Sequence, residues 1–140
     1  MIETKQYIIA DLPEAIKKVK DVIFETKYGY EKTDGLYFDL ANKNIVATNN
    51  HKMKIAKLDC EPSDLKFRIT KDCALILAKY KGIYKVSITD KKDYNSIQFE
   101  HIAENEFSSK LKIITMNISG TYPDYQKLAE DHKDKVKIYA

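Results

Sequence analysis

The sequence predicts an α+β domain made of two similar halves, each formed by a strand, a helix and several antiparallel strands. Apolar residues recur at helical spacing in two segments, 12–24 and 71–81, and alternating strand-like runs precede and follow both. No proline-rich or glycine-rich linker divides the chain, which has only 4 glycines and 3 prolines in 140 residues. One helix on a few strands buries little, so the two halves are expected to share one core.

The first half covers residues 4–60 and opens with a predicted strand at 5–11. Asp11 is placed to cap the helix that follows, and Pro13 stands in the first turn, where proline is tolerated. After a turn at 33–35, three strands are expected over residues 36–40, 45–48 and 52–58.

The second half covers residues 63–128 and repeats this order. A strand is expected at 65–69, and Thr70 is a plausible N-cap for the second helix, with Gly82 as its stop. Further strands are expected over residues 83–89, 96–102 and 109–118. The two halves together form a single domain, 1–128.

A turn with a physical cause follows the last of these strands. Gly120 gives backbone freedom, Pro123 fixes its own φ, and Tyr122 and Tyr125 flank the bend. Beyond it, residues 129–140 are charged, with one apolar patch at 136–139. This last segment is expected to be either a disordered tail or an edge strand.

The composition is that of an ordinary folded protein, with 44% hydrophobic and 32% charged residues. The chain has no apolar run of the roughly 18–20 residues that span a bilayer, and its first residues lack a signal-peptide pattern. The two cysteines have no metal-ligand spacing. A cytoplasmic location is therefore expected. The net charge of +3 does not by itself indicate nucleic-acid binding.

No catalytic motif is recognisable. The chain has no Ser-His-Asp order and no glycine-rich phosphate loop, and His51, His101 and His132 are far apart in sequence. The acidic pairs Asp90/Asp93 and Glu104/Glu106 resemble solvating charges in turns. A non-enzymatic protein without a metal or cofactor is expected. An enzyme whose residues converge only in the fold stays open as an alternative.

Four segments resemble a known family. They are Leu12-Pro-Glu-Ala15, Val46-Ala-Thr-Asn-Asn-His-Lys-Met53, Phe107-Ser-Ser-Lys-Leu111 and Gly120-Thr-Tyr-Pro-Asp-Tyr125. Their order and rough spacing over residues 4–128 are similar to one domain of the bacterial DNA polymerase III beta subunit, the DNA sliding clamp, and to its central domain most. The resemblance implies a DNA-clamp (processivity) fold, with two strand–helix–strand-strand-strand units and two helices packed on antiparallel sheet.

The chain departs from the family in four places. Asn49-Asn50 replaces an Asp-Gly pair, although asparagine tolerates left-handed backbone angles. Met53 replaces a leucine, and residues 112–119 form a small insertion into or beside the pocket wall. The family's subunits have three such domains, whereas this chain has the length of one, so a ring would need about six copies or partner chains.

The resemblance implies a DNA replication processivity factor that encircles duplex DNA and holds polymerase or other partners through a peptide-binding pocket. The implied pocket residues are Thr33, Thr48, His51, Lys52, Met53, Pro123, Lys127 and Leu128. The implied DNA-facing residues are Lys17, Lys18, Lys20, Lys71 and Lys79. Self-association or assembly with other clamp-domain chains is expected, and no membrane partner.

Simpler interpretations stand beside each implied site. Without the resemblance, Met53, Tyr125 and Leu128 fit the edge of a core equally well. The lysines alternate with Asp21 and Asp72, as they would on an ordinary solvated helix face. The alternative function is a stand-alone interaction module or regulator, with a clamp-like fold, that binds partner peptides without encircling DNA.

Overall fold

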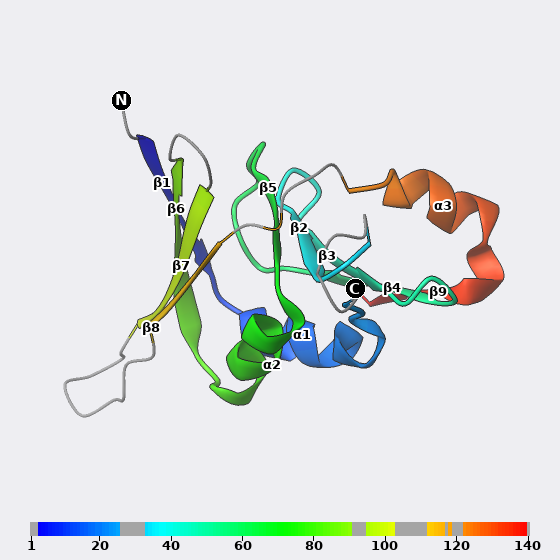
Figure 1. The fold of residues 1–140 in the computed structure, drawn as a ribbon, viewed down its shortest axis with the longest axis horizontal. Coiled ribbons are helices and arrows are strands. Elements are labelled where there is room, and N and C mark those ends of the chain that lie inside the picture. Colours follow the sequence, from blue (N-terminus) through cyan, green and yellow to red (C-terminus); the bar gives the residue numbers. More distant parts are fainter. Residues whose placement is uncertain are drawn as a thin grey trace.

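The computed structural model describes residues 3–25, 33–90, 95–102, 112–116, 118 and 122–139. Two sheets and a pair of helices form the body, and a third helix lies apart from that pair (Figure 1). The elements in chain order are β1 (Glu3–Ile9), α1 (Leu12–Val19), η1 (Lys20–Val22), β2 (Leu36–Asp39), β3 (Asn44–Thr48), β4 (Met53–Lys57), β5 (Lys66–Ile69), α2 (Lys71–Lys79), β6 (Ile83–Asp90), β7 (Asn95–Ile102), β8 (Lys112–Met116), α3 (Tyr125–Asp131), η2 (Lys133–Lys135) and β9 (Val136–Tyr139).

The two halves exchange their first strands. Sheet A has the order β1-β6-β7-β8, and sheet B has the order β5-β2-β3-β4-β9. Strand β1 therefore pairs with the second half, from Glu3 opposite Asp90 to Ile9 opposite Tyr84, while β5 pairs with β2 of the first half. Separating the halves would break both ladders, which makes the two sheets one cooperative body. The predicted α+β class is confirmed.

The core lies between the helix pair and the inward faces of the two sheets. Helices α1 and α2 pack against each other, and α1 also contacts β3 and β4. Ile16, Val19 and Leu77 of the helices are fully buried in one cluster with Phe38 and Phe99 of the sheets. The helical spacing seen in the sequence is thus the spacing of the buried face.

The helix ends differ in part from the prediction. Thr70 caps α2 as expected, because its hydroxyl oxygen accepts a hydrogen bond from the Cys73 amide at 3.2 Å. Asp11 does not cap α1. Its carboxylate instead accepts from the amide of Asp59 at 2.8 Å and ties the chain after β4 to the start of α1. The α1 helix ends at Val19 and continues as a 3₁₀ turn to Val22, which is shorter than the predicted 12–24.

The C-terminal segment is more ordered than the sequence indicated. Helix α3 was not predicted. It begins after Asp124, whose side chain accepts from the Lys127 amide at 3.2 Å. Of the two alternatives for the tail, the structure shows an edge strand over Val136–Tyr139, which pairs with β4. This pair is parallel, so sheet B is mixed rather than wholly antiparallel.

Most of the expected insertion lies away from the pocket. Residues 112–116 form β8, which pairs with β7 at the edge of sheet A. Ile118 reaches sheet B, where its amide donates to the carbonyl of Arg68 in β5 at 3.1 Å. In the described part of the chain, no helix combines the length and the apolar character needed to cross a lipid bilayer.

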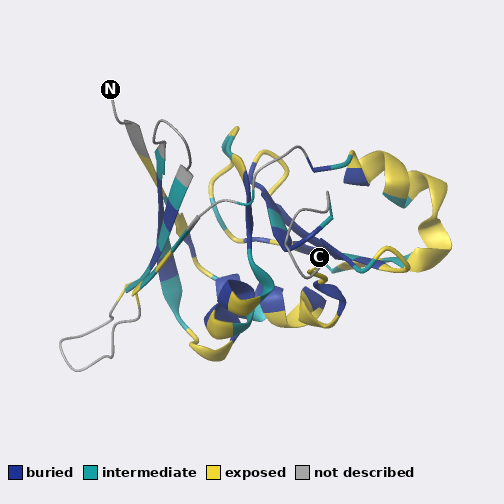
Figure 2. Cartoon of the chain, viewed as in Figure 1, coloured by how far each residue is buried: buried dark blue, intermediate teal, exposed yellow. Residues whose placement is uncertain are grey.

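Sheet B is buried on both faces, as Figure 2 shows for its central strands. All five residues of β3 are buried. Ile45 and Ala47 point into the main core, whereas Val46, between them, belongs to a second apolar cluster on the outward face. That second cluster also contains Met53 and Tyr122, so the C-terminal segment covers the outward face.

Gly35 provides a test of the junction between β2 and β5. Its φ is +83°, and a Cβ added there would overlap the carbonyl oxygen of Ile69. We expect Gly35→Ala to lower the free energy of unfolding by about 2 kcal/mol or more, measured by urea denaturation. Gly82→Ala is a comparison for backbone strain alone, because its φ is +145° but its added Cβ meets the movable side chain of His101 and not backbone. A loss at Gly35 below about 1 kcal/mol would contradict this interpretation.

Candidate functional site

The turn between β3 and β4 is shaped by polar side chains instead of glycine. The Asn49 side-chain oxygen accepts hydrogen bonds from the amides of His51 at 3.0 Å and Lys52 at 2.8 Å. The Thr48 hydroxyl donates to the carbonyl of Lys52 at 2.8 Å and accepts from the Asn50 amide at 3.2 Å. Asn50 has φ of +72°, a left-handed conformation that glycine adopts readily and that asparagine adopts more often than most other residues. The Asn-Asn pair thus supports a tight turn.

The second turn is anchored through Tyr122. Its ring stacks on Tyr37 of β2, with centroids 4.2 Å apart and planes 5° apart. The guanidinium of Arg68 in β5 lies 5.8 Å from the ring centroid on Tyr122, and its Nη1 donates to the carbonyl of Asp34 at 3.2 Å. Both Tyr122 and Arg68 are buried. These contacts hold the turn on the outward face of sheet B.

Tyr125 anchors the start of α3 by hydrogen bonds. Its hydroxyl donates to the carboxylate of Asp39 and accepts from Nδ2 of Asn44 at 3.0 Å. Nδ2 of Asn42 donates to the same Asp39 carboxylate at 2.8 Å. Burial raises the pKa of the Tyr125 hydroxyl above the ordinary tyrosine value, so the group stays a donor across the physiological range.

The two turns therefore lie on one face of one sheet. The β3–β4 turn borders a pocket of about 270 Å³ whose lining also includes residues of α3, η2 and β9, whereas none of its described lining residues belongs to the 122–125 turn. Among the eight predicted pocket residues, this pocket brings together Thr33, Thr48, His51, Lys52, Met53 and Leu128. Thr33 is held by its hydroxyl, which donates to the Asn50 side-chain oxygen at 3.0 Å. The floor is apolar, because Met53 packs with Val46 and Ile55 in the outward cluster.

Pro123 and Lys127 do not line this pocket. Pro123 follows the buried Tyr122 and is half-buried in the turn itself. Lys127 is exposed on α3, one position before Leu128. Successive helical residues point about 100° apart, so a helix that directs Leu128 into the pocket directs Lys127 away from it.

The C-terminal segment supplies a wall that was not predicted. Asn50, His132, Lys135 and Val136 complete the lining. Val136 of β9 stands opposite Met53 of β4 in the parallel register. The apolar patch at 136–139 was the only sequence signal for this wall. His51 and His132 line the same pocket although they are distant in sequence.

The pocket offers an apolar floor with a basic rim. Lys52 and Lys135 lie on the rim, and no carboxylate is among the described lining residues. Leu128 is 38% exposed and so presents its side chain to a ligand, whereas Met53 is 7% exposed. Such a site can hold an apolar side chain of an extended peptide. In the parts of the chain that the structure describes, no group of three His, Cys, Asp or Glu residues could hold a metal ion.

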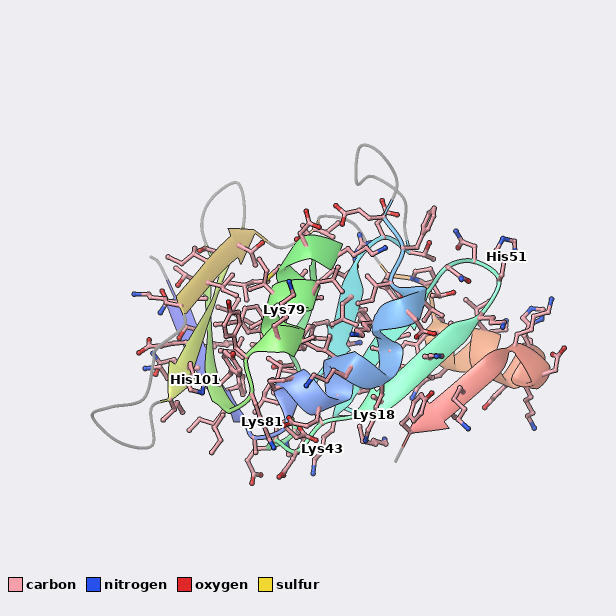
Figure 3. All side chains as sticks on the ribbon, turned by 90° about the horizontal axis from the view of Figure 1, so that it is seen from below. Lys18, Lys43, His51, Lys79, Lys81 and His101 are labelled. Atoms are coloured by element: carbon pink, nitrogen blue, oxygen red, sulfur yellow. The ribbon has the colours of Figure 1, made fainter. Side chains whose placement is uncertain are left out.

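The predicted DNA-facing lysines lie on the helix pair, on the other side of sheet B from this pocket. Lys17, Lys18, Lys20 and Lys79 are exposed, and Lys71 is half-buried. Figure 3 looks onto the helices and shows Lys18 on α1 and Lys79 on α2, with Lys81 just beyond α2; Lys81 was not among the predicted residues. His51 and His101 lie at opposite ends of the molecule in this view.

The carboxylate of Asp21, which follows α1, forms an ion pair with Lys54 of β4. The carboxylate of Asp21 is 2.7 Å from the Lys54 ammonium, and the hydrogen bond from Lys54 lowers the pKa of Asp21. This exposed pair adds little stability, but it keeps Asp21 from cancelling the charge of the α1 lysines.

Several predicted features lie outside the described residues. They include the Phe107–Leu111 segment, Gly120 and Thr121 of the last motif, most of the charged turn at 90–93, and Glu104 and Glu106. The sequence matches no model of a known protein family and no curated protein.

The Tyr125 hydroxyl gives a first prediction for this region. Tyr125→Phe leaves the buried carboxylate of Asp39 without its hydroxyl donor, and we expect the free energy of unfolding to fall by about 1–3 kcal/mol. Tyr80→Phe, which removes the same atom from a ring that is 51% exposed, serves as the matched control. Equal urea midpoints for the two variants would argue against the buried hydrogen bond.

The tyrosines also predict a dependence on pH. Burial raises the pKa of both Tyr122 and Tyr125 in the folded protein. The unfolded chain therefore loses these protons first, and the stability they contribute is lost as the pH rises above about 10. We expect the free energy of unfolding to fall above that pH, and to fall less steeply in the Tyr122→Phe/Tyr125→Phe double variant. The same slope in both proteins would show that these rings are not buried.

Proposed function

We propose that this protein is a DNA-clamp-fold, sliding-clamp-like DNA replication processivity factor of the cytoplasm, non-enzymatic and assembled from several copies. One observation supports the proposal above all. The turn between β3 and β4 and the turn at 122–125 lie on the outward face of sheet B, while the exposed lysines lie on the helices that cover its inward face. A protein that tethers partners to DNA needs these two functions on separate faces.

The exchanged strands support the proposed fold. A strand-helix-strand-strand-strand unit occurs twice, and each unit donates its first strand to the other. In the family that the sequence resembles, such domains form a ring with helices inside and sheets outside. The helix pair of this chain carries an excess of exposed lysines, as contacts to phosphates require. These contacts need positive charge and not a base-reading geometry.

The groove beside the β3–β4 turn supports peptide binding. Its apolar floor and basic rim suit an extended peptide with an apolar anchor residue. In the resembled family, the neighbouring domain completes the pocket. Here residues of α3, η2 and β9 line part of the groove, so this chain could bind the peptide without a neighbouring domain.

A second candidate function is a stand-alone interaction module that does not encircle DNA. The position of β9 favours it. This strand pairs along β4, so the edge that sheet B leaves for another chain on this side is the four-residue strand β9 and not β4. Binding of a partner peptide without duplex binding would support this second function over the first.

Charge reversal on the helix pair tests the proposed DNA contact. We expect the Lys18→Glu/Lys79→Glu variant to bind duplex DNA at least about ten-fold more weakly at low salt, with a shallower dependence on salt concentration, because fewer counterions are released. Lys66→Glu/Lys112→Glu reverses two exposed lysines in strands β5 and β8 and keeps the same net charge. Fluorescence anisotropy with a labelled duplex is the measurement. An equal loss of affinity for duplex DNA in the two variants would contradict the assignment of the helix lysines as the DNA-binding residues.

Leu128 is the best position at which to test the groove. Met53 is nearly fully buried, so a charge there would also destabilise the fold. Leu128→Glu is expected to weaken binding of a synthetic peptide that carries the clamp-binding motif of a bacterial polymerase by about ten-fold or more. Ile114→Glu, at a residue 65% exposed on β8, is the control. Calorimetry that gives equal affinities for both variants would refute the groove assignment.

A further inference from the structure

A second pocket lies between α3 and the outward face of sheet B, next to the groove beside the β3–β4 turn, with which it shares the lining residue Val136. Its volume is about 390 Å³, within the range of small-molecule sites. Its apolar walls are Ile55 of β4, Ala129 of α3, and Val136 and Ile138 of β9. Tyr125 and Asn44, each 5% exposed, are the buried polar residues of its lining and form its inner end.

The polar group at the inner end has a fixed orientation. The Tyr125 hydroxyl donates its single proton to Asp39, so Asn44 has to present its Nδ2 amide to the hydroxyl oxygen, which it does at 3.0 Å. The amide oxygen of Asn44 therefore points away from Tyr125. Asn44 donates to Tyr125, and Tyr125 donates to Asp39. The amide oxygen of Asn44 is therefore left as an acceptor at the start of this hydrogen-bonded chain.

This acceptor is unused. Asn44 is 5% exposed, and its Oδ1 has no hydrogen-bond partner among the described residues. A buried acceptor without a donor raises the free energy of the folded protein. A ligand that donates a hydrogen bond to this acceptor removes that cost, so the hydrogen bond adds more to binding than the same bond to a solvated acceptor. The pocket thus combines an apolar lining with one unmet requirement for a hydrogen-bond donor.

The rim does not select for charge. Lys57 and Lys133 lie there together with Glu130, and the Lys57 ammonium already donates to the carbonyl of Asn42 at 3.2 Å. The nearest buried charge, the Asp39 carboxylate, is not among the lining residues and already accepts from Tyr125 and Asn42. A charged ligand would therefore lose its hydration against the apolar walls without a counter-charge in contact with it. A flat ring gives much contact area for little conformational entropy between a helix and a sheet.

We propose that this pocket binds a small, neutral aromatic molecule that carries one N–H or O–H group and donates it to Oδ1 of Asn44. The ligand packs against Ile55 and Ala129, and a small shift of the Asn44 side chain opens its oxygen to the donor. The site requires neither duplex DNA nor a partner peptide, so it stands independently of the function proposed above.

Indole and 1-methylindole are the probes, because they share a ring system and differ in the donor. For a ligand of about nine non-hydrogen atoms, we expect indole to bind the unmodified protein with a dissociation constant in the millimolar range, measured by amide NMR titration. The shifted amides should include Asn44 and Ala129. Because 1-methylindole lacks the N–H donor, it should bind about five-fold or more weakly than indole.

A substitution that fills the pocket tests whether indole binds there. Ala129→Leu places a larger side chain in the pocket and should weaken indole binding by about ten-fold or more, whereas Ala41→Leu, the same change in an exposed turn, should leave it unchanged. Thermal denaturation serves as the control that both leucine variants fold. The comparison of indole with 1-methylindole uses the unmodified protein and does not depend on any variant. Equal binding of both indoles, no shift at Asn44 and Ala129, or equal binding by the two leucine variants would each overturn the proposal.

Discussion

The attachment of the 122–125 turn to sheet B is the constraint on which the outward half of the molecule depends. Tyr122 is held between the Tyr37 ring and the Arg68 guanidinium, and Tyr125 is hydrogen-bonded to a buried carboxylate. Burying an aromatic side chain contributes roughly 1.5–3 kcal/mol. Without these contacts, the outward face of sheet B would expose Val46, Met53 and Ile55 to water, and α3 and β9 would have no support.

This constraint also gives the molecule two different faces. The inward face of sheet B packs on α1 mainly with apolar residues, beside the Lys54–Asp21 ion pair, and the helices present lysines on their far side. The outward face is covered by a short segment that leaves two pockets along its sides. In the function proposed above, the helix face would bind a polyanion and the outward face would bind partners at the same time, which is what tethering requires.

The residues that could be predicted from the sequence are those whose local pattern fixes their structure. The periodicity of Leu12, Ile16 and Val19 and the cap at Thr70 gave the two body helices. The Asn-Asn turn was expected because asparagine adopts a left-handed φ, and Asn50 does so. Six of the eight residues that the resemblance implied for the pocket do line one pocket.

The remainder depends on contacts between distant segments, which a local pattern does not contain. Nothing near Glu3–Ile9 indicates that β1 pairs with β6, since strand exchange is a property of the whole fold. Helix α3 is a short segment with few apolar residues, and it is held mainly by Tyr125. Likewise, β9 is stable as a strand only because β4 offers an open edge for Val136 to pair on.

Sedimentation equilibrium at micromolar protein concentration, with and without a nicked circular duplex, tests the central claim most directly. The account predicts a closed assembly of about six copies that is present alone or forms on the circle, because one domain is too small to surround a duplex. A protein that stays monomeric under both conditions would contradict encirclement and would leave only the stand-alone module.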